Sequence, residues 1–265
     1  MSDYQTISVD IDGAIARLTL DRPEVRNAMN PEMIGEITAA FAGFNGNDDI
    51  RAVILRGNGG VFCAGGDLNW MKDVLGQTEQ EVQEDSRHLL NMYRAINESP
   101  KLVIAALEGA VIAGGLGLVA CSDVVIAEAK TKFCVSEVKI GLAPGIIAAY
   151  MLPRIGAGWM RYLSKTAILF DGETARTTGL VHEIASDTAD LEKRLASHID
   201  LVLGASPDAI ARTGKLIDDL GYSVSEEMLT TGLIYNAKAR LSDEAQEGIS
   251  SFLEKRKPAW FPDDD

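Results

Sequence analysis

The sequence predicts an α/β protein whose C-terminal part is helical. As far as Asp187, short apolar stretches that end in glycine or in acidic residues alternate with longer amphipathic stretches. Beyond Asp187 only helical patterns follow. The chain has 265 residues, of which 46% are hydrophobic, and this is enough for one sizeable core. Strands followed by helices, and then helices alone, indicate an α/β core with a helical extension.

The N-terminal elements are expected to be a hairpin, a helix and two short strands. The segment "YQTISVDIDGAIARLTL" reads as two strands joined at Asp12-Gly13, because Asp-Gly is a strong hairpin signal. In "NPEM", Asn30 is expected to cap a helix and Pro31 to take its first position. The stretches "AVILRG" and "VFCAGG" then read as strands.

The rest of the chain continues this alternation before it becomes helical. A long helix is expected over residues 77–99, since apolar residues recur there at helical spacing. Three more strands are expected at "KLVIAALEG", "SDVVIAE" and "TKFCVSE". The pattern is mostly helical after Gly145, and its last four helices are expected at residues 190–203, 207–220, 225–239 and 243–255.

Composition excludes several classes of function. The formal net charge of −14 leaves no basic footprint for nucleic acid and disfavours an anionic membrane surface. Three cysteines without C-x-x-C spacing and three scattered histidines predict neither disulfides nor a bound metal. The stretch "MSDYQTISVD" lacks the features of a signal peptide, and charges interrupt every apolar run. We therefore expect a cytoplasmic enzyme with a small-molecule substrate.

Two glycine-rich turns are the first indication of chemistry. Part of "VIAGGLGLVA" fits G-x-G-x-x-A, but the next strand follows too soon for the crossover helix of about 10–12 residues that a dinucleotide fold needs. A short helix from Gly114 is expected instead, and "VFCAGGDLNWM" likewise turns through Gly66 into a helix. Two free glycine N–H groups at one oxygen would form an oxyanion hole. On spacing alone, two ordinary glycine turns remain an alternative.

Five ordered motifs resemble the crotonase, or enoyl-CoA hydratase/isomerase, superfamily along nearly the whole chain. The segment "LDRPEVRNAMNPEM" resembles R-P-x-x-R-N-A, "FCAGGDL" resembles F-x-A-G-x-D-L, and "EGAVIAGGLGL" resembles N-G-x-A-x-G-G-G. Further on, "FCVSEVKIGLAPG" resembles F-x-x-P-E-x-x-x-G-x-x-P-G, and "RTTGLVHEI" resembles A-x-x-x-G-L-V. The resemblance implies a crotonase-like spiral of ββα turns over residues 1–200 and a helical trimerisation region over residues 201–265.

The resemblance also implies an acyl-CoA substrate, with coenzyme A as part of the substrate and no separate cofactor. Gly66 and Gly114 would hold the thioester oxygen, and Glu137 would be the acid/base. A homotrimer or a hexamer is implied as well. The residues that would bind coenzyme A are Arg26, Ala64, Asp67, Leu68, Lys255 and Lys257.

The sequence departs from the family pattern at the acid/base. Standard hydratases carry two glutamates, but the first of them falls at Gly117, which has no side chain. The stretches "SEVKIGLAPGII" and "FLEKRKPAW" resemble bacterial hydratases of 3-methylglutaconyl-CoA and isohexenylglutaconyl-CoA, which act in leucine and acyclic terpene breakdown. Lys139 is a candidate partner for the distal carboxylate of such substrates. Three functions stay open: a hydratase, a Δ3,Δ2-enoyl-CoA isomerase with a single glutamate, and a non-catalytic acyl-CoA-binding subunit.

Overall fold

A six-stranded sheet forms the centre of the molecule. The computed structural model describes residues 4–222 and 224–262. Neighbouring strands follow the order β1-β2-β3-β4-β6-β9; β1 and β2 form the expected antiparallel hairpin, and the other pairs are parallel. The strands are β1 (Ile7–Asp12), β2 (Ile15–Leu20), β3 (Ala52–Gly57), β4 (Leu102–Leu107), β6 (Val124–Glu128) and β9 (Glu183–Ala185).

A second, three-stranded sheet shows that the chain is a spiral of ββα turns. It contains β5 (Ala110–Ile112), β7 (Lys132–Cys134) and β8 (Phe170–Asp171). The chain places β4 in the large sheet, β5 in the small one, then forms helix α4 (Gly114–Ala120), and repeats this with β6 and β7. The α/β spiral implied by the family resemblance is therefore confirmed.

The expected strand at "VFCAGG" is wrong. The segment forms only two isolated bridges, from Cys63 to Val111 of the small sheet and from Gly66 to Met29. Gly60 and Gly65 have left-handed φ angles of 73° and 96°, so only a few residues between them remain extended. The segment is thus a reduced strand of an earlier spiral turn, and its glycine-bounded end is free to form a loop.

The helices of the first half begin close to where the sequence predicts, and α1 packs against β1 and β2 of the large sheet. Helix α1 (Pro31–Asn45) is capped by Asn30, whose side chain accepts from the Met33 N–H. The short helix α2 (Leu68–Val74) precedes α3 (Glu79–Asn97), which a capping box at Thr78 initiates. Tyr93 of α3 is fully buried.

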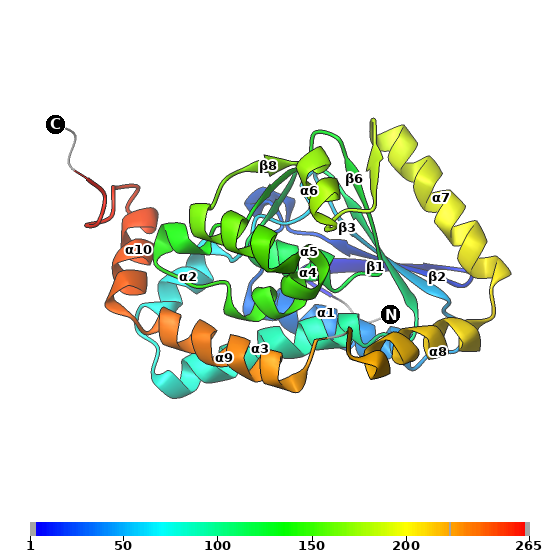
Figure 1. Ribbon diagram of the computed structural model, residues 1–265, viewed down its shortest axis with the longest axis horizontal. Helices are drawn as coiled ribbons and strands as arrows, with labels where there is room; N and C mark the ends of the chain where they lie inside the picture. Colours follow the sequence, from blue (N-terminus) through cyan, green and yellow to red (C-terminus); the bar gives the residue numbers. More distant parts are fainter. Residues whose placement is uncertain (1–3, 223, 263–265) are drawn as a thin grey trace.

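The second half is helical, as expected, and it packs back onto the core of the same chain. Helix α9 contacts α5 and α3, while α10 contacts α2 and the 3-10 turn η2 (Glu137–Ile140). Figure 1 shows α9 beside α3 and α5, with α10 at the end of the molecule near the C-terminus. The division predicted at residue 200 falls inside α7. The helices are α5 (Gly145–Thr166), α6 (Gly172–Thr178), α7 (Thr188–Gly204), α8 (Pro207–Ile217), α9 (Glu226–Arg240) and α10 (Asp243–Leu253).

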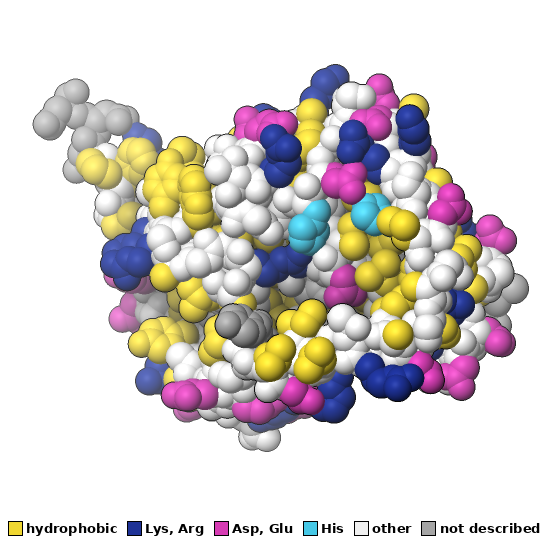
Figure 2. All heavy atoms as spheres, turned by 45° about the vertical axis from the view of Figure 1, so that its right-hand side comes forward, with side chains coloured by type: hydrophobic (Ala, Val, Ile, Leu, Met, Phe, Trp, Pro, Cys, Tyr) yellow, Lys and Arg dark blue, Asp and Glu magenta, His cyan; other side chains and the backbone are white. Residues whose placement is uncertain are grey.

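Two hydrophobic clusters hold these layers together. In β3, Val53 and Leu55 face the main core, whereas Ala52 and Ile54 face a smaller cluster that includes Leu191 of α7. A strand covered on both faces explains the unbroken apolar run "AVIL". None of the described helices is long and apolar enough to cross a membrane. On the face shown in Figure 2, acidic and basic side chains are interspersed.

Candidate active site

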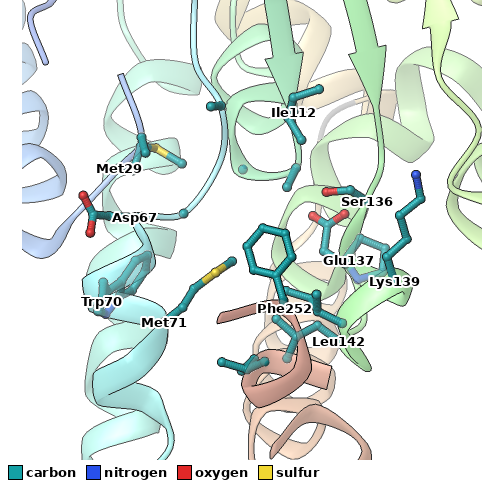
Figure 3. Close-up of a pocket in the computed structure, with 18 of the residues that line it drawn as sticks. Met29, Asp67, Trp70, Met71, Ile112, Ser136, Glu137, Lys139, Leu142 and Phe252 are labelled. Carbon is teal, nitrogen blue, oxygen red and sulfur yellow. The ribbon is translucent and has the colours of Figure 1, made fainter. Parts of the chain in front are cut away.

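One cavity brings together the three residues predicted to be catalytic. It has a volume of about 960 Å³, and Gly66, Gly114 and Glu137 all line it. Its walls come from the loops that follow the reduced strand and β5, from η2, and from helices α2, α9 and α10. Figure 3 shows Trp70 and Met71 on one side of this cavity, Glu137 on the other, and Phe252 between them. Segments far apart in the sequence therefore meet at one site.

The direction of the Gly66 N–H follows from the hydrogen bonds that its two neighbours, Gly65 and Asp67, form with Met29. The Met29 N–H donates to the Gly65 carbonyl at 2.7 Å, and the Asp67 N–H donates to the Met29 carbonyl at 2.8 Å. Gly66 lies between these two bonds, so its own N–H points away from Met29. Among the described residues this N–H has no acceptor. It is available to a ligand in the cavity.

Residues of the R-P-x-x-R-N-A motif hold the Gly66 loop in place. Arg22 forms an ion pair with Asp67, with 2.8 Å between Nη2 and Oδ2, and its Nη1 donates to the Ala28 carbonyl. The buried Asn27 side chain donates to two carbonyls of the loop at residues 58–61. Two motifs that are separate in the sequence are thus one structural unit behind the Gly66 N–H.

The Gly114 N–H is presented by a strained residue. Ala113 has φ 46° and ψ −118°, a conformation that a residue with a Cβ rarely adopts and that typically costs about 1–3 kcal/mol. The Leu116 N–H donates to the Ala113 carbonyl at 2.9 Å, which directs the N–H of the same peptide unit the opposite way. The Gly114 N–H has no acceptor in residues 4–222 and 224–262. Strain at this position is consistent with a functional role.

Glu137 is a partly buried residue whose carboxylate has no charged partner among the described residues. Its Oε2 is shielded from solvent and forms no hydrogen bond within the part of the chain that the structure describes. Burial raises the pKa of Glu137 from its ordinary value of 4.5 to about 7, and its own backbone N–H partly offsets this. A carboxyl group with this pKa can both accept and return a proton near neutral pH.

The space for a second acid is filled by a tyrosine. A Cβ added to Gly117 would lie 2.5 Å from Cζ of Tyr93, whose side chain is fully buried. A glutamate introduced at position 117 would therefore meet the tyrosine ring before it met a substrate. Of the other acids in the lining, Asp67 is paired with Arg22 and Glu24 is exposed. Among the carboxylates of the described lining, Glu137 alone has an oxygen, Oε2, that is shielded from solvent and has neither a hydrogen bond nor an ion pair.

The residues predicted to bind coenzyme A divide into three pairs, of which Asp67 and Leu68 are the last. Arg26 and Ala64 line the cavity; Arg26 is exposed and forms no ion pair with a described residue. Lys255 and Lys257 do not line the cavity of the single chain, and Lys257 lies over the Phe261 ring at 4.6 Å. These two lysines are therefore not part of the site as one chain forms it.

Asp67 and Leu68 lie at the start of α2, where Asp67 lines the cavity. The Asp67 carboxylate caps α2 through the Asn69 N–H and pairs with Arg22, while its backbone N–H donates to Met29. The Asp67 N–H is therefore not free for adenine, and an adenine contact through other backbone groups of Asp67 and Leu68 stays a prediction. Leu68 is the first residue of α2, and its side chain lies outside the described part.

Sequence reasoning missed the contribution of the C-terminal helices. Asn236 and Arg240 of α9 and Phe252 of α10 line the cavity. Arg240 is 6% exposed and lies 5.4 Å from the centre of the Trp70 ring. Asn236 and Arg240 are four residues apart and thus lie on one face of α9. This spacing was the available signal, but nothing in the sequence placed that face at the glycine turns.

Two other types of site have no support in this part of the molecule. Burial raises the pKa of the Cys63 thiol to about 12, which makes it a poor nucleophile. Among the described residues no three metal-ligating side chains come together.

Comparison with known proteins places the chain in a family. The model of the family described as "Enoyl-CoA hydratase/isomerase" matches residues 10–262. A crotonyl-CoA hydratase of Syntrophomonas wolfei is 30% identical over 96% of this chain and 97% of its own. The peroxisomal Delta(3,5)-Delta(2,4)-dienoyl-CoA isomerase of Arabidopsis thaliana is 26% identical over 98% of each.

A solved structure supports the same assignment. Pseudomonas aeruginosa AtuE superposes with a TM-score of 0.80 and 35% identity, over 97% of this chain and 99% of that one. The chain belongs to the enoyl-CoA hydratase/isomerase family, and an acyl-CoA thioester substrate is consistent with this membership.

Proposed function

We propose that this protein adds water across the α,β double bond of an enoyl-CoA thioester. The observation that carries the proposal is the meeting, in one cavity, of a partnerless buried carboxylate and two peptide N–H groups without acceptors. The N–H groups of Gly66 and Gly114 would donate to the thioester oxygen. Such donors stabilise the negative charge that develops there more than they stabilise the ground state.

One carboxylate is sufficient for a balanced reaction. Glu137 takes a proton from water while the water oxygen bonds to Cβ, and the electron pair of the double bond moves toward the thioester oxygen. The resulting enolate then takes the proton from Glu137 at Cα. Water has been added, and the carboxylate is restored. Its pKa of about 7 suits both steps.

We propose a branched, 3-substituted glutaconyl-CoA of the methylglutaconyl or isohexenylglutaconyl type as the substrate, in leucine or acyclic terpene breakdown. A second alkyl group on Cβ stabilises positive charge there, so water can add without a second acid. The absence of a side chain at Gly117, where a second acid would stand, supports this choice.

The face of α9 supports an acyl group that ends in a carboxylate. Arg240 binds Gln77 and Asp85 through Nη2 alone, which leaves Nε and Nη1 without an acceptor among the described residues. Asn236 accepts from Ser86 through Oδ1, so its amide N–H groups are also available. Two adjacent donors, one of them a buried cation, would match a distal carboxylate. Lys139 also lines the cavity, but Figure 3 shows its ammonium pointing away from Leu142 and Phe252.

The coenzyme A moiety would lie at the exposed mouth of the cavity. Arg26 is placed there to meet a phosphate, and the Ala64 carbonyl has no donor among the described residues and is available to the adenine amino group. Coenzyme A enters as part of the substrate, and the proposed reaction needs no further cofactor.

The isomerase remains the second candidate because a single carboxylate can also carry one proton between two carbons. The similarity to a dienoyl-CoA isomerase supports it. A non-catalytic acyl-CoA-binding subunit is disfavoured, since an unpaired buried carboxylate reduces stability and a binding protein gains nothing from it.

We also propose a cytoplasmic homotrimer, which could pair into a hexamer. Large apolar side chains are exposed on the helical half of the chain, and a partner subunit would cover them. Figure 2 shows apolar side chains exposed among charged ones on the side where α7 and α8 come forward. The exposed apolar residues of the helical half include Leu169, Leu201, Leu216, Leu220 and Tyr235.

A panel of enoyl-CoA thioesters, scored by product mass, tests the proposal. The panel pairs straight with branched chains, and a distal carboxylate with its methyl ester. Hydration adds the mass of water, whereas isomerisation leaves the mass unchanged and moves the double bond. We expect hydration of the branched acid, and a preference for acid over ester that falls in Arg240→Met. A product of unchanged mass from every substrate would contradict the hydratase.

A further inference from the structure

The best-defined polar contact behind the oxyanion site comes from a residue that does not line the cavity. Tyr93 of α3 donates its hydroxyl to the Gly114 carbonyl at 2.7 Å. A Cβ on Gly114 would lie 3.2 Å from the same hydroxyl oxygen. The side chain is fully buried and absent from the cavity lining, so it does not touch a substrate.

Gly114 is held from both sides in an orientation that the backbone alone disfavours. On its N-terminal side the Ala113 carbonyl accepts from the Leu116 N–H, and on its C-terminal side its own carbonyl accepts from Tyr93. Between these contacts, Ala113 keeps its unfavourable φ and ψ angles. The Gly114 carbonyl belongs to the peptide unit that follows Gly114. Loss of the Tyr93 contact would therefore act on the Gly114 N–H through rotation about the φ and ψ angles of this glycine, which follows a strained residue.

The position of Tyr93 depends on the glycine that replaces the second acid. Its ring lies against the α4 backbone at Gly117, where a Cβ would be 2.5 Å from Cζ. Any side chain at position 117 would displace the ring and, with it, the hydroxyl. The absence of an acid at position 117 and the hydrogen bond from Tyr93 to Gly114 therefore depend on the same packing of the tyrosine ring.

We propose that Tyr93 is a positioning residue, which fixes the direction of the Gly114 N–H and so keeps the oxyanion site formed. This inference rests on the proposed role of Gly114 as a donor to the thioester oxygen. It adds that the single-acid site and the preformed donor require the same tyrosine.

Tyr93→Phe tests this, with Tyr150→Phe as the matched control. The two rings are neighbours with centroids 5.8 Å apart, but the buried Tyr150 hydroxyl has no partner among the described residues. We expect kcat to fall about ten-fold in Tyr93→Phe, the order for one lost hydrogen bond, with little change in KM. Tyr150→Phe should retain the wild-type kcat. Equal kcat in Tyr93→Phe and the wild type would overturn the proposal.

A bound chromophore separates this inference from the proposed function. A push–pull cinnamoyl-CoA thioester absorbs at longer wavelength when its carbonyl oxygen accepts hydrogen bonds, whether or not the protein turns it over. We expect the shift on binding to shrink in Tyr93→Phe and to persist in Tyr150→Phe. A full shift in Tyr93→Phe would overturn the positioning role. A protein that shows the expected shifts but turns over no enoyl-CoA would refute only the proposed reaction.

Ala113→Gly provides a second variant that tests the mechanism of the effect. Glycine adopts the angles of residue 113 without strain, so less force opposes the Gly114 orientation. We expect the loss caused by Tyr93→Phe to be smaller in the Ala113→Gly background than in the wild type. Strictly multiplicative effects on kcat would contradict the proposed coupling.

Discussion

Replacing Glu137 by glutamine should make the protein more stable and inactive. Burial raises the pKa of Glu137 from 4.5 to about 7, so the folded state binds its proton more tightly than the unfolded state. Stability is then lost as the pH rises from the unfolded value through the folded one. Above pH 7 the charged form lowers stability by about 3 kcal/mol, from about 1.36 kcal/mol per pKa unit.

Glutamine has the same shape and carries no charge, so Glu137→Gln removes this cost. Its gain in the free energy of unfolding should approach about 3 kcal/mol at pH 8 and vanish near pH 4, where both states of the wild type are protonated. The loss of the proton carrier should lower kcat by at least about 10²-fold. Urea unfolding at pH 4, 6 and 8, at one protein concentration, measures the first effect.

The matched control is Glu32→Gln, which changes an exposed carboxylate in the first turn of α1. It should change neither kcat nor the pH dependence of stability. If the gain of Glu137→Gln in the free energy of unfolding over the wild type were no larger at pH 8 than at pH 4, the ionised Glu137 would not have the inferred cost. If it kept more than about a tenth of the wild-type kcat, Glu137 would not be the acid/base.

Three further predictions concern the loops around the cavity. Gly66→Pro and Gly114→Pro remove the donating N–H groups and should each lower kcat about 10²–10³-fold with retained binding of free coenzyme A; near-normal kcat in either would exclude that donor. Arg26→Ala should raise KM for coenzyme A thioesters but not for truncated thioesters, whereas Lys257→Ala should raise it less, because Arg26 lines the cavity and Lys257 does not; an equal loss with truncated thioesters would refute the Arg26 contact. Gly117→Ala should lower the free energy of unfolding by about 1–3 kcal/mol in urea melts, since a Cβ has no space there; unchanged stability would contradict this packing.

Local sequence signals predicted the elements but not every contact of the site. The hairpin at Asp12-Gly13 and the cap at Asn30 depend on a few adjacent residues, and both formed as expected. Gly66, Gly114 and Glu137 could be placed together because ordered motifs identified the family. The reduced strand around Cys63 was misread, since hydrophobicity does not reveal how far flanking glycines bend the chain.

Contacts between segments that are distant in the chain could not be predicted from the sequence. The apolar spacing of residues 77–99 predicted the helix that carries Tyr93, yet nothing in that spacing showed that the Tyr93 ring fills the space at Gly117. Likewise, the lining by Asn236 and Arg240 depends on how α9 packs against α3 and α5. Such contacts arise from tertiary packing, which a single sequence does not encode in any local pattern.

The pH dependence of kcat/KM for the best substrate tests the central claim, a single acid/base, most directly. Glu137 must be ionised to accept the first proton and needs no second protonated group. The profile should therefore rise with pH through one ionisation near pH 7, set by the pKa of about 7, and stay level above it. A bell-shaped profile would reveal a second essential group, and a profile flat from pH 5 to about pH 9 would show that Glu137 does not carry the proton.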